Sequence, residues 1–124
     1  MLAFGICALL IISTVSALPA PSGNVLSAVI HNKQNAPVKC TITWDGPNGV
    51  LSEKDVITIE SNEKGIVEAR NVDMGGYFAF AFIKRIQCGT LVLMHPFQGV
   101  LSIQKVWNFH VQSNALLSVG PSSA

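Results

Sequence analysis

Apolar and polar side chains alternate strictly over residues 38–45, and this alternation constrains the fold of the chain more than any other feature. The odd positions are hydrophilic, whereas the even positions carry Val38, Cys40, Ile42 and Trp44. A helix would distribute these apolar side chains around its circumference, but a strand gathers them on one face because successive side chains point to opposite sides. The segment therefore predicts a half-buried β-strand with Cys40 facing the interior.

The segment from Leu101 to Val111 repeats this pattern over a longer stretch. Its apolar residues occupy odd positions, and Lys105 is the residue that interrupts them. A β-bulge at Lys105, or a lysine stem that lies along the core with its ammonium group in water, would accommodate the interruption. We therefore expect one strand here with a buried face formed by Leu101, Ile103, Trp107, Phe109 and Val111.

The segment from Tyr77 to Ile86 is apolar on both faces. Phe78, Phe80 and Phe82 share one side of the expected strand, and small or aliphatic residues occupy the other side. Such a pattern is typical of a central strand that is covered on both faces. We expect the three phenylalanine rings to pack in the core, because large aromatic side chains are usually buried.

Shorter strands and turns complete the expected fold. Weaker patterns predict strands at residues 24–31, 55–61, 66–72, 90–94 and 116–119, and Gly, Pro, Asn and Asp cluster between them. No segment after residue 17 combines a helical period with suitable caps. The predicted fold class is all-β: an antiparallel β-sandwich, or a small barrel, of about seven to eight short strands with one disulfide, formed by a single domain over residues 24–120.

The first 17 residues predict a secretory signal peptide. An apolar run from Leu2 to Ile12 is too short to span a bilayer as a stable helix, and a segment of small residues ending at Ala17 follows it. We expect a flexible lead-in over residues 18–23, a frayed C-terminal end at 121–124 and a secreted, extracellular product without a transmembrane anchor. Removing 17 of the 124 residues leaves 107, which is enough for one domain.

Two of the three cysteines remain after residue 17, and they predict one disulfide. In an oxidising compartment, Cys40 and Cys88 have a single way to pair within the chain. Free thiols and a bridge between two chains are the alternatives, and a catalytic dithiol would require a Cys-x-x-Cys spacing that these residues lack. We expect the two cysteines on non-adjacent strands, where their disulfide would connect one layer of the sandwich to the other.

The sequence shows no arrangement of residues typical of an enzyme. His31, His95 and His110 lack the local spacing of a zinc pair, and their strand contexts predict scattered positions. The chain has no Gly-x-Ser-x-Gly turn and no Gly-rich phosphate loop, and Asp and Asn in turns usually bond their own backbone rather than calcium. We expect no enzyme activity, no cofactor and no metal site. The net charge of +1, without a run of either sign, also argues against nucleic acid as a partner.

Large or polar side chains in the predicted loops are the remaining candidates for function, because loops commonly carry recognition. For Phe97 two placements are open: a recognition surface, or a ring that folds back over the end of the core. The residues expected to contact a partner are Trp44, Asn48, Met74, Tyr77, His95 and Phe97. We predict a small non-catalytic binding protein that recognises an extracellular protein or glycan.

Two other functions are open at this point. The face that carries three phenylalanines could line a cavity between the sheets, and the protein would then carry a small hydrophobic ligand. Low charge and bare strand edges also permit a membrane-active or self-assembling sandwich. The pattern of residues does not indicate the oligomeric state.

Overall fold

The computed structural model describes residues 23–46 and 52–122. The predicted signal peptide, almost all of the lead-in and the candidate Asn48 lie outside these ranges. The described residues form strands and turns without a helix. The strands are β1 (Ala28–Asn32), β2 (Val38–Asp45), β3 (Ser52–Ile59), β4 (Lys64–Val67), β5 (Asn71–Asp73), β6 (Phe78–Phe80), β7 (Phe82–Cys88), β8 (Leu91–Met94), β9 (Trp107–Val111) and β10 (Leu116–Pro121).

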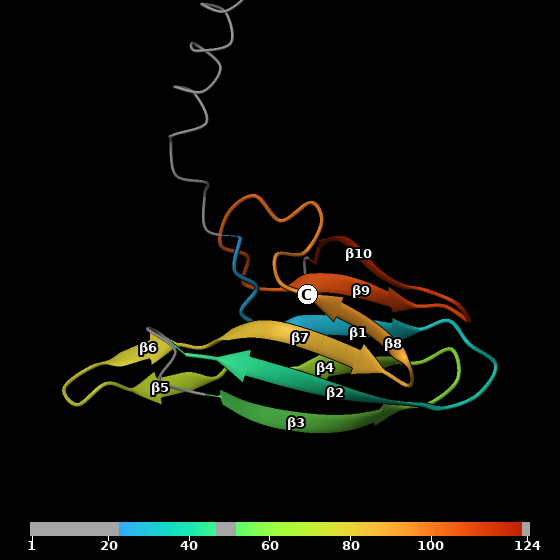
Figure 1. The fold of residues 1–124 in the computed structure, drawn as a ribbon, viewed down its shortest axis with the longest axis horizontal. Helices are drawn as coiled ribbons and strands as arrows, with labels where there is room; N and C mark the ends of the chain where they lie inside the picture. Colours follow the sequence, from blue (N-terminus) through green and yellow to red (C-terminus); the bar gives the residue numbers. More distant parts are fainter. Residues whose placement is uncertain (1–22, 47–51, 123–124) are drawn as a thin grey trace, which may run out of the picture.

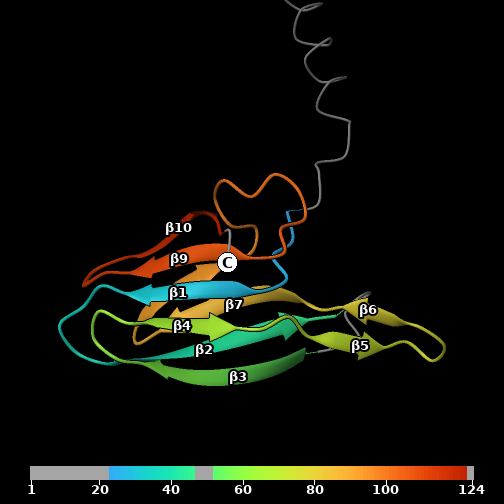
Figure 2. The same cartoon turned by 180° about the vertical axis from the view of Figure 1, so that it is seen from behind.

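Two four-stranded sheets pack face to face and form a sandwich (Figure 1). The first sheet has the strand order β10-β9-β1-β4, and the second has the order β3-β2-β7-β8. This arrangement confirms the predicted all-β sandwich in place of the small barrel. Among the described residues, β5 and β6 pair only with each other, and their hairpin extends beyond the sheets at one end (Figures 1 and 2).

One strand pairing departs from the predicted antiparallel pattern. β1 and β9 run parallel, with Ala28 opposite Trp107 and Asn32 opposite Val111, whereas the other pairings between named strands are antiparallel. Parallel neighbours require a long connection, and here β2 to β8 come between the two strands in the sequence. Alternation within a strand carries no information about the direction of its neighbour, so the sequence did not predict this pairing.

Side chains from both sheets meet in one core. The even positions of β2 point inward as predicted, and Ile42 and Trp44 are fully buried. From the facing sheet, Ile30 of β1 and Phe109 of β9 are also fully buried. Each large apolar side chain that is removed from water in this way stabilises the fold by about 1.5–3 kcal/mol. The alternation therefore predicted correctly which face of these strands forms the core.

The expected strand from Leu101 to Val111 is shorter than predicted. Only β9 is a strand, whereas Leu101 and Ile103 are 75% and 60% exposed, so their predicted burial was wrong. The preceding segment instead pairs with residues 24–26 through Gln104, whose N–H donates to the carbonyl of Asn24 and whose carbonyl accepts from Leu26. This backbone pairing satisfies polar groups without burying the apolar side chains beside them.

The expected strand from Tyr77 to Ile86 is divided at Ala81 into β6 and β7. The division reverses the predicted burial: Ala81 and Ile83 are fully buried, whereas Phe78 and Phe80 are 70% and 54% exposed. When both faces of a strand are apolar, alternation does not determine which face points inward. The predicted strand over residues 66–72 divides in the same way, so residues 23–46 and 52–122 form ten strands instead of seven to eight.

The predicted disulfide between Cys40 and Cys88 is confirmed, with an S–S distance of 2.10 Å. Its predicted position between the two layers was wrong. The two cysteines face each other on β2 and β7, which are neighbours in the second sheet, and their Cα atoms are 4.1 Å apart. The prediction failed because β2 and β7, which are far apart in the sequence, are neighbours in the same sheet. The bond closes a loop with a sequence separation of 48 residues.

Gly65 allows β4 to approach the edge of the second sheet. A Cβ atom at this position would lie 2.8 Å from Cγ1 of Ile59 and 3.0 Å from Cδ1 of Ile57. Ile59 is only 2% exposed and has little freedom to move. We expect Gly65→Ala to lower the free energy of unfolding by about 1–3 kcal/mol through overpacking, measured by urea denaturation. Gly76→Ala, where nothing lies within 4 Å of the added Cβ, is the control, and equal effects of both substitutions would contradict this account.

Candidate functional site

The hairpin of β5 and β6, residues 71–80, carries the largest exposed aromatic side chains of the described residues, and we call it the aromatic hairpin. Tyr77, Phe78 and Phe80 are 66%, 70% and 54% exposed, and Met74 beside them is half-buried. Single exposed apolar residues are ordinary on protein surfaces, but neighbouring ones form a patch that is typical of an interaction site. The aromatic hairpin is therefore the candidate site.

The turn of the aromatic hairpin is held by its own hydrogen bonds. The N–H of Met74 donates to the carbonyl of Tyr77 over 2.8 Å, and the N–H of Gly75 donates to Oδ1 of Asp73 over 2.9 Å. Gly75 has a φ of 93°, a conformation that glycine adopts at no steric cost. The exposed rings are thus presented by a defined turn.

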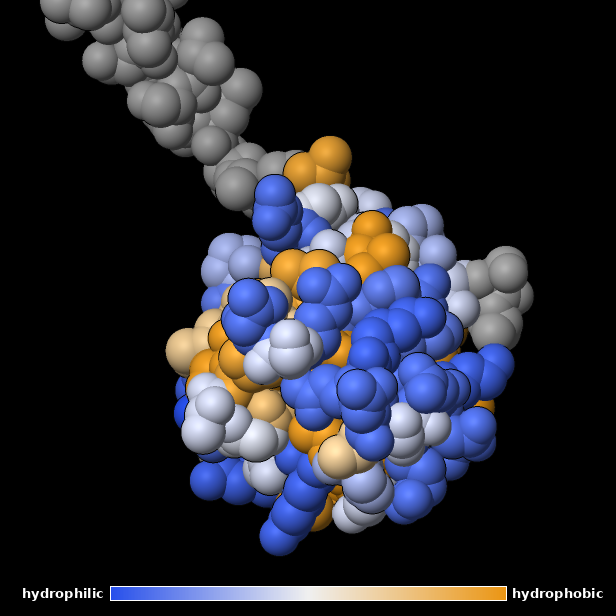
Figure 3. Space-filling model, turned by 90° about the vertical axis from the view of Figure 1, so that its right-hand side faces the viewer, coloured by the Kyte–Doolittle hydropathy of each residue, from blue (hydrophilic) through white to orange (hydrophobic). Residues whose placement is uncertain are grey.

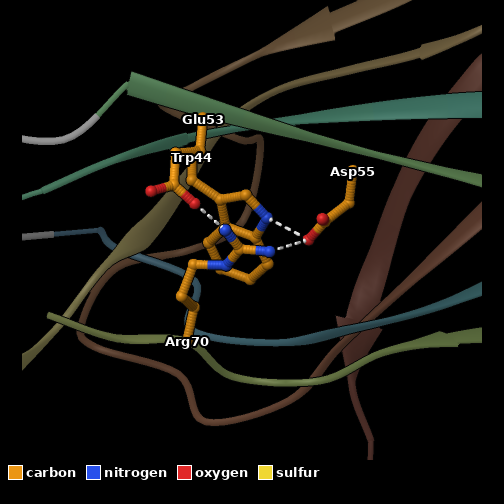
Figure 4. Close-up of polar contacts among 4 residues, drawn as sticks. All are labelled: Trp44, Glu53, Asp55 and Arg70. Carbon is orange, nitrogen blue, oxygen red and sulfur yellow. Dashed lines mark hydrogen bonds and ion pairs between the residues drawn. The ribbon is translucent and has the colours of Figure 1, made fainter.

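The base of the aromatic hairpin is fixed to the second sheet by Arg70 (Figure 4). Its guanidinium group forms ion pairs with Glu53 and, over 2.5 Å, with Asp55, both on β3. It also lies over the ring of Trp44, 5.6 Å from the centroid, a cation–π contact worth about 0.5–1 kcal/mol at such sites. At the base of the hairpin, the N–H of Ala81 donates to the carbonyl of Arg70 over 2.9 Å and joins the two strands there. These contacts hold the hairpin in one orientation.

Two of the predicted binding residues are not on the surface. Trp44 is fully buried, and its Nε1–H donates to Oδ2 of Asp55 over 2.9 Å. Phe97 is 2% exposed and packs edge-on against Phe109, with ring centroids 5.1 Å apart. The second of the two placements considered for Phe97 is thus the observed one. Neither side chain is available to a partner. Both residues lie next to loops in the sequence, but their rings point into the core at the end of the sandwich.

The other predicted residues divide into two groups. Met74 and Tyr77 come together on the aromatic hairpin, next to Phe78 and Phe80, which sequence reasoning assigned to the core. His95 lies apart from them, half-buried, with its ring centroid 5.2 Å from that of Phe82 and 6.3 Å from that of Phe97. The Gly-Gly turn before Tyr77 was the sequence signal that pointed to the hairpin.

The end of the sandwich opposite the aromatic hairpin is largely hydrophilic, although some apolar residues also reach this surface (Figure 3). The loops after β1, β3 and β9 meet there around Asn32, which is fully buried. The Nδ2 group of Asn32 donates to the carbonyls of Ala36, Ile59 and Glu60, and its Oδ1 accepts the N–H of Gln34. This side chain therefore ties two loops together, and a shallow depression beside it is lined by Lys33, Gln34, Asn35, Ala36, Gln112 and Ser113.

His31 and His110 lie next to each other, although the sequence predicted scattered histidines. They face each other in the register of β1 and β9, with ring centroids 5.0 Å apart. Burial lowers the pKa of His110 below its ordinary value, and the neighbouring His31 and Lys33 lower this pKa further. The prediction failed because the two strands pair in parallel across a long sequence separation. In residues 23–46 and 52–122, no three or more His, Cys, Asp or Glu side chains are grouped to hold a metal ion.

Across the described ranges, the chain contains no helix that is long and apolar enough to cross a membrane. No protein family model, no curated protein and no solved structure matches this chain.

Proposed function

We propose that this is a small, secreted, non-catalytic binding protein that recognises an extracellular protein through the aromatic hairpin. The observation that carries the proposal is the exposure of Tyr77, Phe78 and Phe80 on a hairpin whose base is fixed by Arg70. Aromatic side chains are enriched at protein interfaces and dominate their binding energies. A rigid element also loses little conformational entropy when it binds.

The backbone of β6 favours a protein as the partner. Backbone hydrogen bonds join Met74 to Tyr77 at one end of the β5–β6 ladder and Ala81 to Arg70 at the other end. In an antiparallel ladder, hydrogen-bonded residue pairs alternate with pairs that are not hydrogen-bonded. Phe78 and Phe80 occupy non-bonded pairs, and their N–H and C=O groups point away from β5. Among the described residues no strand pairs with this edge. An extended segment of a partner would complete the ladder there while contacting the two rings, which is β-strand addition.

The charge of the aromatic hairpin argues against an anionic membrane as its target. Asp73 is the only charged residue between positions 71 and 80, whereas surfaces that bind anionic lipids carry Lys and Arg. A glycan would contact the rings but would not form the ladder hydrogen bonds that an extended protein segment forms with β6. Crosslinking from the hairpin distinguishes a protein partner from a glycan or a membrane.

The exposure of Phe78 and Phe80 removes the reason for proposing a carrier of a hydrophobic ligand. That alternative was based on three phenylalanines facing a space between the sheets, but Phe78 and Phe80 lie outside the sandwich. The space between the sheets is occupied by large side chains, including Trp44 and Phe109. Among the described residues, the exposed aromatic side chains that a partner can contact are those of the aromatic hairpin.

Replacing the three exposed rings tests the proposal. We expect Tyr77→Ser combined with Phe78→Ser and Phe80→Ser to weaken partner binding at least about tenfold, since aromatic residues at the centre of an interface commonly contribute about 2 kcal/mol or more each. The thermal midpoint should stay close to that of the unmodified protein because the rings are exposed. A photo-crosslinking amino acid at Phe78 would first identify the partner from extracellular fluid, and biolayer interferometry would then compare the variants.

The matched control removes apolar residues that are equally exposed elsewhere. Leu101→Ser with Ile103→Ser changes a different surface, since the two side chains are 75% and 60% exposed, and this variant should keep full affinity. The proposal fails if the hairpin variant binds the cross-linked protein as tightly as the control does. It also fails if the crosslinks form only to glycans, or if the hairpin binds neutral vesicles instead of a protein.

A further inference from the structure

A pair of imidazoles lies on the outer face of the first sheet, far from the aromatic hairpin. Ile30 and Phe109 point into the core, so His31 and His110, which follow them on β1 and β9, point to the opposite face. The two rings face each other in register, with centroids 5.0 Å apart and an angle of 63° between their planes. Both side chains are half-buried, so each ring remains accessible to solvent.

Asn108 determines which nitrogen of His31 is free. It lies two residues before His110 on β9 and shares its face of the sheet. Its Nδ2 donates to the carbonyl of Pro121 over 3.2 Å, which leaves Oδ1 3.2 Å from Nε2 of His31. An amide oxygen only accepts, so Nε2 carries the proton and Nδ1 of neutral His31 keeps its lone pair. Metal-binding histidines are typically oriented by such a bond from the other ring nitrogen.

We propose that His31 and His110 bind one divalent transition-metal ion, with Cu²⁺ preferred to Zn²⁺. Imidazole nitrogen suits both ions, and the general order of affinities places Cu²⁺ above Zn²⁺. Water completes the coordination, so the site is open and exchanges its ion. Lys64 lies opposite His31 on β4, and Lys33 follows on the same side of the molecule. Their charges oppose a cation and keep the affinity below that of a closed site with four ligands.

Copper titration of the exported, tag-free protein tests this site directly. Isothermal titration with CuCl₂ should give one ion per chain with a lower Kd than ZnCl₂ gives. Electron spin echo envelope modulation of the Cu²⁺ complex should show two equatorial imidazoles. In proton NMR spectra of the unmodified protein, low Cu²⁺ should broaden the ring signals of His31 and His110 before those of His95, a readout that requires no variant.

Substitutions identify the ligands. His31→Asn and His110→Asn should each raise the Kd at least about tenfold, because even outer-shell changes cost about 10–100-fold. Asn108→Leu should raise the Kd for Cu²⁺ by a smaller factor than either histidine substitution. The spin echo spectrum of this variant should still show two imidazoles, because Asn108 positions His31 and does not bind the ion. His95→Asn, the matched control, should leave the Kd unchanged. The proposal is wrong if Cu²⁺ does not bind, if one imidazole or none is found, or if His95 broadens first. The proposed function of the aromatic hairpin is unaffected by any of these results.

Discussion

Removing the disulfide by Cys40→Ala with Cys88→Ala is expected to lower the free energy of unfolding by about 4 kcal/mol. A bond that closes a loop with a separation of 48 residues restricts the unfolded chain by about this amount in the chain-entropy account. Urea denaturation at equilibrium, monitored by tryptophan fluorescence, would measure the difference. The effect is a large fraction of the total stability of a small domain, which is about 5–15 kcal/mol.

The unmodified protein under reducing conditions provides the control for side-chain volume. Both cysteines are buried, at 0% and 1% exposure, so alanine also removes packing. The reduced protein keeps both sulfur atoms and should still lose most of the 4 kcal/mol expected for loop closure, about 3–4 kcal/mol. An unchanged midpoint of denaturation after complete reduction would contradict the structural role of the bond.

Trp44→Ala has the second large expected effect, a loss of about 3–5 kcal/mol of stability. The indole is fully buried, donates to Asp55 and lies under the guanidinium group of Arg70. Trp44→Phe keeps most of the apolar volume and removes the hydrogen bond, so its expected loss is smaller, about 1–2 kcal/mol. Thermal and urea denaturation of the three proteins would separate the contribution of packing from that of the hydrogen bond.

Hydrogen exchange gives a local readout for the same substitution. Because Trp44 supports Arg70 at the base of the aromatic hairpin, Trp44→Ala should increase amide exchange in β5 and β6 beyond the global loss of stability. Phe109→Ala is the matched control, since that ring is equally buried but has no contact with Arg70 among the described interactions. If both variants raise exchange in the hairpin equally, Trp44 does not support it specifically.

Alternation predicted the parts of the fold in which one face is polar. In β2 and β9, alternate residues were predicted to be buried, and the structure confirms this burial for Ile42, Trp44 and Phe109. Alternation gave the wrong burial for Phe78, because both faces of its segment are apolar. It also gave the wrong burial for Leu101, because backbone pairing holds that apolar segment at the surface. In such segments the neighbours in space decide burial, and a single sequence does not specify them.

The candidate site was only partly predictable for the same reason. The turn residues around Met74 and Tyr77 marked a surface loop, but the rings that complete the patch were assigned to the core. The pairing of His31 with His110 depends on two parallel strands that meet across most of the chain. Local patterns describe each strand separately, so contacts between distant strands, and sites built from them, appear only in the folded structure.

The position of β1 inside its sheet has a consequence for biosynthesis. β1 lies between β9 and β4, and His31 and Asn108 on the neighbouring strand are 77 positions apart in the sequence. During translation, one edge of β1 therefore lacks its native neighbour until β9 has been made. Contacts between residues so far apart in the sequence form slowly, and partly folded intermediates with exposed apolar surface and unpaired strand edges therefore persist for longer. We expect a chain that ends before residue 107 to leave this edge of β1 unpaired and to be prone to aggregation.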